Sequence, residues 1–164
     1  MPEITILGWM HTFVGIFALV VGIYTLAIHQ VISNEQTAGR VYLLSTLITA
    51  ISSLGIYNQG GFGPAHVLGV LTLLALLAGF LVTKMGVFSK ISAYLQAFCY
   101  SSTFLFHMIP AITDGLRRLP VGDPVVTDPE DPLLLNFYLL FLLLFFVGYA
   151  LQVLWLRKNT KEVS

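Results

Sequence analysis

Long apolar stretches separated by short polar segments dominate the chain. Five of them, each close to the ~20 residues that an α-helix needs to cross a bilayer, cover residues 6–28, 41–57, 65–85, 91–112 and 133–156. This pattern predicts an all-α fold, a polytopic transmembrane helical bundle with five spans. We expect the bundle to form a single integral membrane domain over residues 1–164, because no remaining segment is long enough for a soluble domain.

The second stretch is the weakest of the five. It is short and contains five hydroxyl side chains, namely Ser45, Thr46, Thr49, Ser52 and Ser53. Hydroxyls inside a membrane helix can donate to carbonyls of their own helix. We therefore expect a buried transmembrane helix here, and the alternative is a re-entrant segment.

The segments between the stretches contain turn residues. Pro64 ends a glycine-rich connection and suits the first turn of the third helix. Asp131 is predicted to cap the fifth helix, with Pro132 at its first position. Residues 85–90 are predicted to form a tight connection. Because Met1-Pro2-Glu3 carries no positive side chain, the first stretch is predicted to be a retained span and not a cleaved signal peptide.

Composition supports the membrane interpretation. Of the 164 residues, 57% are hydrophobic and 10% are charged, and the mean hydropathy is +0.86. Soluble domains carry roughly 25% charged residues, so a soluble or disordered chain is excluded. The formal net charge of zero argues against nucleic-acid binding. Cys99 is the only cysteine, which excludes an internal disulfide.

Basic residues predict the orientation of the bundle. With five spans, six lysines and arginines fall on one side of the membrane and only Arg117 and Arg118 on the other. The positive-inside rule then places the N-terminus outside and the C-terminus in the cytoplasm. Aromatic residues agree, with Trp9 and Tyr57 predicted at the outer boundary and a second group at the inner one. That inner group consists of Tyr42, Tyr94 and Trp155.

Small and polar residues mark the helix faces that are expected to point inward. Glycines recur at positions 8, 15 and 22 of the first stretch, and glycines and threonines share one face of the third. Such residues let neighbouring backbones approach closely. The fifth stretch is mostly Leu and Phe, so we expect it at the periphery, with Asn136 and Gln152 forming interhelical hydrogen bonds or lying at the interface.

Three histidines are predicted to lie at one level of the bundle. The first and third stretches begin outside, and the fourth ends outside. Counting residues along each helix therefore places His11, His66 and His107 in the outer half of the membrane, on three different helices. His29 is left alone at the cytoplasmic end, where an interfacial role is expected.

Ionisable side chains inside a membrane usually have a functional reason. Imidazole is an axial ligand of b-type haem and a common ligand of transition metals. Two of His11, His66 and His107 are candidate axial ligands of one haem b, and all three are candidate ligands of zinc or copper with an open fourth position. The alternative is that each histidine only donates a hydrogen bond to a carbonyl or hydroxyl, with Thr72 and Thr103 as candidate partners.

Other candidate chemistry is sparse. Asp114, Arg117 and Arg118 are predicted just outside the fourth helix, where they form a solvated ion pair or hold an anionic head group or a haem propionate. The sequence contains no phosphate-binding glycine loop, zinc-protease motif or serine nucleophile motif. A catalytic activity is therefore not assigned.

Several short segments resemble an uncharacterised family of bacterial predicted integral membrane proteins. They are His11-Thr-Phe-Val-Gly15, Gly39-Arg40-Val41-Tyr42, Phe62-Gly63-Pro64-Ala65-His66, His107-Met-Ile-Pro110, Arg118-Leu-Pro120 and Asp131-Pro132. The resemblance covers most of the chain and implies a small helical bundle in the bacterial inner membrane. Histidines on successive helices also distantly resemble di-haem cytochrome b proteins. Those proteins pair histidines at both membrane faces, whereas His29 has no partner here.

The leading hypothesis is an inner-membrane protein that binds one b-type haem, or otherwise a metal ion, near the outer face. Its role would be electron transfer with a quinone or a periplasmic redox partner. A small-solute or proton-linked transporter is the first alternative. A non-catalytic membrane scaffold or assembly subunit is the second, and homo-oligomerisation is compatible with each of the three.

Overall fold

The computed structural model describes residues 4–57, 61–85 and 91–161 and shows five α-helices and no strand in them. The helices are α1 (Ile6–His29), α2 (Thr37–Ser53), α3 (Pro64–Met85), α4 (Ser92–Arg118) and α5 (Pro132–Lys161). The predicted all-α fold is confirmed. The Met1–Glu3 leader and most of the predicted 85–90 connection, including Lys90, lie outside the described residues.

Three of these helices are long and apolar enough to cross a membrane. They cover Ile6–His29, Pro64–Lys84 and Pro132–Asn159. The side chains that the bundle leaves exposed are mostly large and apolar, whereas several of its fully buried side chains are threonines. This inverted distribution is typical of helices packed in lipid, where polar groups need protein partners.

Local signals explain where the helices begin and end. The Thr5 hydroxyl accepts a hydrogen bond of 3.1 Å from the Gly8 N–H at the start of α1. Pro64 occupies the first position of α3 as predicted. At the start of α5, the Asp131 carboxylate accepts a hydrogen bond of 2.8 Å from the Leu133 N–H, which confirms the predicted cap.

Three helices differ from their predicted bounds by four residues or more, and one of them, α5, ends at Lys161, five residues past the predicted end. Helix α2 begins at Thr37, four residues before the predicted start, and ends at Ser53. Hydropathy cannot detect this polar first turn, in which Gly39 packs so tightly against the Ser33 carbonyl that a Cβ would clash with it. Helix α4 continues through Pro110 to Arg118, six residues past the predicted end. Asp114 and both arginines therefore lie on α4 and not beyond it, which corrects the sequence prediction.

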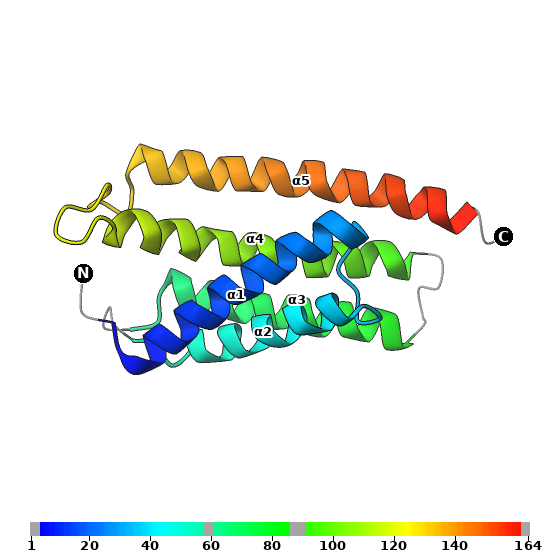
Figure 1. Ribbon diagram of the computed structural model, residues 1–164, viewed down its shortest axis with the longest axis horizontal. Coiled ribbons are helices and arrows are strands. Elements are labelled where there is room, and N and C mark those ends of the chain that lie inside the picture. The colour runs from blue at the N-terminus through cyan, green and yellow to red at the C-terminus, as the bar shows by residue number, and fades with distance from the viewer. Residues whose placement is uncertain (1–3, 58–60, 86–90, 162–164) are drawn as a thin grey trace.

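The helices run back and forth along the long axis of the molecule, and α1 crosses the others obliquely (Figure 1). Helix α1 packs mainly on α2, α3 packs on α4 and α2, and α4 packs on α5. The start of α1, the end of α2 and residues 119–131 all lie at one end of the bundle, which we call the cavity end (Figure 1). This arrangement matches the alternating directions expected of successive spans.

The core lies between α1, α2 and α4. Its buried cluster consists of Ala18, Ile32, Tyr42, Leu43 and Tyr100. Tyr42 is completely buried, so its predicted place in an inner aromatic belt is wrong. The reason is the early start of α2, which carries Tyr42 into the bundle beside Gly22 of α1, where a Cβ added to the glycine would lie 2.8 Å from the Tyr42 ring.

Helix α5 lies at the periphery, as predicted, and its one extensive contact among the described helices is with α4. Among the described residues, three hydrogen bonds from side chains join the pair, one of them from the Tyr149 hydroxyl to the Tyr94 carbonyl over 3.3 Å. Ser101 donates to Gln152 over 2.9 Å, and the hydroxyls of Thr113 and Tyr138 are 2.7 Å apart. Gln152 thus forms the predicted interhelical bond, whereas Asn136 is exposed.

Candidate functional site

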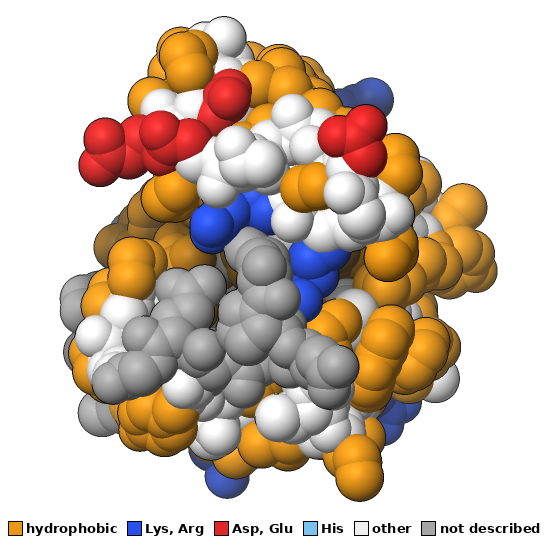
Figure 2. All heavy atoms as spheres, turned by 90° about the vertical axis from the view of Figure 1, so that its left-hand side faces the viewer, with side chains coloured by type: hydrophobic (Ala, Val, Ile, Leu, Met, Phe, Trp, Pro, Cys, Tyr) orange, Lys and Arg blue, Asp and Glu red, His pale blue; other side chains and the backbone are white. Residues whose placement is uncertain are grey.

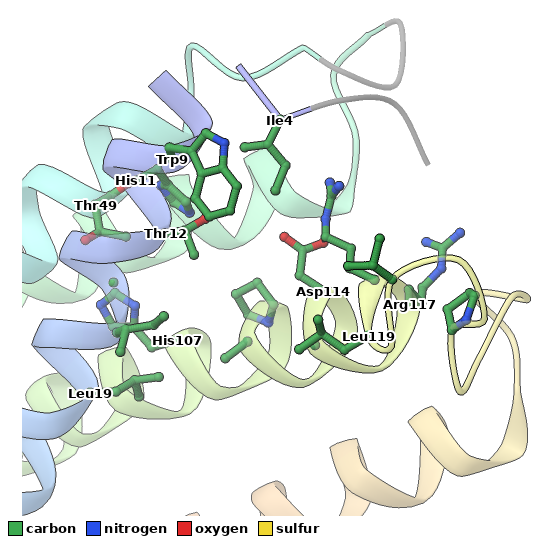
Figure 3. A pocket seen from close by; sticks show the side chains of 18 of the residues that line it. Ile4, Trp9, His11, Thr12, Leu19, Thr49, His107, Asp114, Arg117 and Leu119 are labelled. Atoms are coloured by element: carbon green, nitrogen blue, oxygen red, sulfur yellow. Dashed lines mark hydrogen bonds and ion pairs between the residues drawn. The ribbon is translucent and has the colours of Figure 1, made fainter. Parts of the chain in front are cut away.

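A cavity of about 950 Å³ opens between α1 and α4 at the cavity end, with Thr49 of α2 in its wall. Ligand and cofactor sites typically measure roughly 300–1,000 Å³, so this cavity is large enough for a cofactor. Both His11 and His107 line it (Figure 3), and we call it the His11–His107 cavity. Its wall is otherwise mainly apolar and includes Trp9, Ile16, Leu19, Pro110, Ala111, Leu119, Val121 and Pro124.

His11 is held by α2. The carbonyl oxygen of Thr49 is 3.1 Å from His11 Nδ1, and the Ser52 hydroxyl is 3.0 Å from the same nitrogen. A carbonyl can only accept, and Ser52 donates its own proton to the Thr49 carbonyl over 2.9 Å. His11 Nδ1 therefore carries the hydrogen, and Nε2 carries the lone pair. A histidine that ligates a metal through Nε2 commonly donates its Nδ1 hydrogen to a backbone carbonyl, which fixes the orientation of the ring.

His107 reaches the same cavity from α4. Its side chain is 8% exposed, and its Nε2 lies 3.2 Å from the Thr46 hydroxyl of α2. The contact with Thr46 uses Nε2, so Nδ1 is the ring nitrogen of His107 that this contact leaves unused. The sequence prediction that His11 and His107 meet near one end of the bundle is consistent with this arrangement.

His66 lies elsewhere, near the start of α3, and it does not line the cavity. Its ring packs between Tyr57 and Phe62, with centroid distances of 4.7 and 5.1 Å. The Gly63 N–H donates to His66 Nδ1 over 3.1 Å, which occupies the lone pair of that nitrogen. Its Nε2 is buried without a hydrogen-bond partner. The structure thus brings together two of the three predicted histidines, and His29 is the last residue of α1 at the opposite end.

Charged residues of α4 stand at the mouth of the cavity. Arg117 and Asp114 lie along the helix between His107 and the loop (Figure 3), and Arg118 forms the expected ion pair with Asp114 at 3.6 Å. The Arg117 Nε is buried and makes no hydrogen bond. Seen from this end, basic side chains lie recessed near the centre and acidic side chains lie along one edge (Figure 2). The mouth is therefore suited to an anionic group.

The cavity offers two imidazoles, from His11 and His107, in a mainly apolar wall. In the described parts of the chain, no group of three or more His, Cys, Asp and Glu side chains is placed to hold a metal. A catalytic zinc site takes three protein ligands, whereas haem iron needs only one or two axial ligands from the protein. Two imidazoles in a mainly apolar cavity with arginines at its mouth could supply the one or two axial ligands that haem iron needs.

Sequence reasoning did not identify the partners of the two histidines. It predicted that the hydroxyls of the second stretch donate to carbonyls of their own helix, which is correct for Thr49 and Ser53. It placed Tyr42 at the membrane interface. The signal that could have identified these partners is the spacing of polar residues along α2. Tyr42, Thr46 and Thr49 recur every three or four residues, so they share one helix face. That face is the one turned toward His11 and His107.

Comparison of the chain with protein-family models, with curated proteins and with solved structures finds no match.

Proposed function

We propose that this chain is a five-span membrane protein that binds one b-type haem in the His11–His107 cavity and takes part in electron transfer. One observation carries the proposal, which is that imidazoles from two helices line the same cavity while α2 occupies only one nitrogen of each. A bound haem supplies an iron that gains and loses single electrons. The second nitrogen of each ring is the group that we assign to the iron.

The chain's own residues have distinct roles in this proposal. His11 binds through Nε2 and is oriented by the Thr49 carbonyl. His107 binds from α4. Arg117 holds an anionic group at the mouth, such as a propionate, because charge-assisted bonds to carboxylates are the strongest that arginine makes. The apolar wall excludes water from the site.

The membrane arrangement completes the proposal. We infer that α2 and α4 cross the bilayer together with the three apolar helices, with the cavity end outside and the C-terminus in the cytoplasm of a bacterial inner membrane. The asymmetry of basic residues supports this orientation. A cavity at the outer end suits exchange of electrons with a periplasmic protein or with a quinone in the outer leaflet.

An absorption spectrum tests the haem assignment. The protein is expressed in haem-supplemented bacteria, purified in mild detergent and examined for a Soret band and for its haem content. We expect roughly one haem per chain in the unmodified protein. His11→Ala and His107→Ala should lose most of it, because each removes an iron ligand.

His29→Ala and His66→Ala serve as matched controls, since neither ring lines the cavity, and both should retain the band. Size-exclusion profiles and circular dichroism establish that each variant is folded. A folded, unmodified protein without a Soret band contradicts the proposal. Transport or a scaffold role then becomes the leading explanation of the bundle.

A further inference from the structure

A second and smaller cavity, of about 160 Å³, lies between α4 and α5, with Leu26 of α1 also in its wall. We call it the α4–α5 groove. A protein cavity of about 150 Å³ lined by apolar side chains holds one benzene ring, so the groove has room for one six-membered ring. Its wall is mainly apolar and includes four aromatic side chains, which are Phe104, Phe141, Phe145 and Tyr149.

The groove is open along the exposed side of α5. Leu144 lines it and is 57% exposed. Gly148, one turn further along the helix, lines it as well, and nothing lies within 4 Å of a Cβ added to this glycine. Helix α5 is apolar enough to cross a membrane. A membrane-soluble molecule can therefore enter the groove from the lipid and extend a tail past Leu144 and Gly148.

One end of the groove is polar. Ser101 and Gln152 line it there with side chains that are 8% and 7% exposed, and Ser101 donates to the Gln152 oxygen over 2.9 Å. The Tyr149 hydroxyl already donates to the Tyr94 carbonyl. The Gln152 amide nitrogen has no hydrogen-bond partner among the described residues and keeps some accessible surface. Because an amide N–H without a partner is costly in apolar surroundings, this end favours a ligand with an acceptor oxygen.

These features match a ring that carries a carbonyl oxygen. Small-molecule sites are typically apolar and aromatic, with a few polar groups that fix the orientation of the ligand. We propose that the α4–α5 groove binds the ring of a membrane quinone, and that the Gln152 amide donates a hydrogen bond to one of its carbonyl oxygens. A lipid acyl chain has no acceptor for this amide, and neither has an apolar side chain from a second copy of the protein.

The groove lies next to the His11–His107 cavity. His107 lines the cavity, and Met108, the following residue of α4, lines the groove. Consecutive residues of a helix lie on different faces, so the two sites are separated by about the width of α4, roughly 10 Å. Exchange of electrons between the ring and the haem rests on the proposed function. Binding of the ring rests on the groove alone.

A purely structural role for Gln152 makes a different prediction. Its bond to Ser101 joins α4 and α5, as side-chain amides of membrane helices commonly do. If this bond were its whole function, Ser101→Ala and Gln152→Leu would have equal effects. If the amide binds the ring, only Gln152→Leu removes the donor, and Ser101→Ala leaves it in place.

Photolabelling of haem-free protein in mild detergent measures the binding. The probe is an azido-substituted benzoquinone with a short alkyl tail, and labelled peptides are identified by mass spectrometry. We expect saturable labelling within residues 101–108 of α4 or 141–152 of α5. Unlabelled benzoquinone with the same tail should displace the probe, whereas an alkylbenzene with that tail should displace it poorly because it has no carbonyl.

Two variants test the groove itself. Gly148→Leu fills the open space beside α5 and should abolish the saturable labelling. Gln152→Leu should weaken binding several-fold, the effect of losing one hydrogen bond. Ala150→Leu adds similar bulk at an exposed position of α5, and it should bind the probe like the unmodified protein, as should Ser101→Ala. Size-exclusion profiles and circular dichroism establish that each variant is folded.

Several results would overturn the proposal. The first is an unmodified protein without saturable labelling in the groove, and the second is a folded Gly148→Leu that is labelled normally. Equal displacement by the alkylbenzene would assign the groove to a lipid chain. A dimer that Gly148→Leu dissociates would assign it to a second copy. Equal weakening in Ser101→Ala and Gln152→Leu would assign Gln152 to helix packing and reject its bond to the ring.

The haem experiment can fail independently of this one. A missing Soret band together with saturable labelling of the groove would reject the haem and retain the quinone site. A haem-binding protein whose groove is not labelled would reject the quinone site and retain the haem.

Discussion

At the scale of single residues, the charged side chains that line the cavity lie at its mouth, and the described interior of the bundle uses neutral hydrogen bonds. Arg118 and Asp114 form an ion pair with side chains that are 24% and 58% exposed. Such solvent-exposed pairs contribute little to stability, roughly 0–1 kcal/mol. Their importance lies in the charge that they present to an incoming ligand.

Asp114→Asn should therefore leave the protein almost as stable as before, within about 1 kcal/mol in a denaturant titration in detergent. Because it removes a negative charge from the mouth, it should tighten the binding of an anionic cofactor. Arg117→Gln should weaken that binding several-fold. Titration of haem into the cofactor-free variants measures both effects, and equal affinities for the two variants would contradict an anion-binding mouth.

Residue counting along each helix was enough to predict that His11 and His107 meet. It could not predict their partners, because the direction of a hydroxyl on α2 depends on what packs against it. Thr49 bonds within its own helix, whereas Thr46 has an imidazole of α4 within reach. The separation of His66 from the other two was equally hidden, since it depends on the Tyr57 and Phe62 rings around it.

At the scale of elements, close approach of helices explains the small residues. A Cβ on Gly22 of α1 would lie 2.8 Å from the Tyr42 ring and 2.9 Å from the Phe104 ring. Real Cβ atoms do not come so close, and the Tyr42 ring is completely buried. The glycine therefore sets the distance between α1 and its two neighbours.

Gly22→Ala should destabilise the bundle by roughly 1–3 kcal/mol, the typical cost of overpacking a core. Gly148→Ala is the control, because nothing lies within 4 Å of a Cβ at that position in α5. It should leave stability unchanged or slightly higher, since alanine favours a helix. Unfolding in mixed detergent micelles compares the two variants, and an equal loss in both would show that α1 does not pack as described.

The positions of all five helices were predictable because each contains a continuous, mostly apolar stretch. The ends of α2, α4 and α5 were not, because hydropathy ends a helix where polar residues begin. The polar last turns of α4 extend to Arg118, and the first turn of α2 depends on Gly39 fitting against Ser33. These features arise from backbone contacts that composition does not record.

At the scale of the whole molecule, the bundle has two different ends. The cavity end carries Arg117, Arg118 and the acidic loop, and the opposite end carries most of the basic residues. The five-span topology and its orientation remain predictions, as does the resemblance to bacterial integral membrane proteins. Both ends offer exposed positions at which the orientation can be measured.

Val125→Cys and Glu35→Cys, each introduced with Cys99→Ser, test the orientation. Val125 is 58% exposed in the loop at the cavity end, and Glu35 is exposed in the connection between α1 and α2. A membrane-impermeant maleimide added to intact spheroplasts should label Val125→Cys, and should label Glu35→Cys only after permeabilisation. The reverse result would place the cavity end in the cytoplasm.

The peripheral place of α5 has a consequence for biosynthesis. Every residue that lines the His11–His107 cavity precedes position 125, and none belongs to α5. Chains are made from the N-terminus, and early parts can fold before later ones are translated. All residues that line the pocket are therefore synthesised before the last helix, and the pocket does not need α5 to complete its wall.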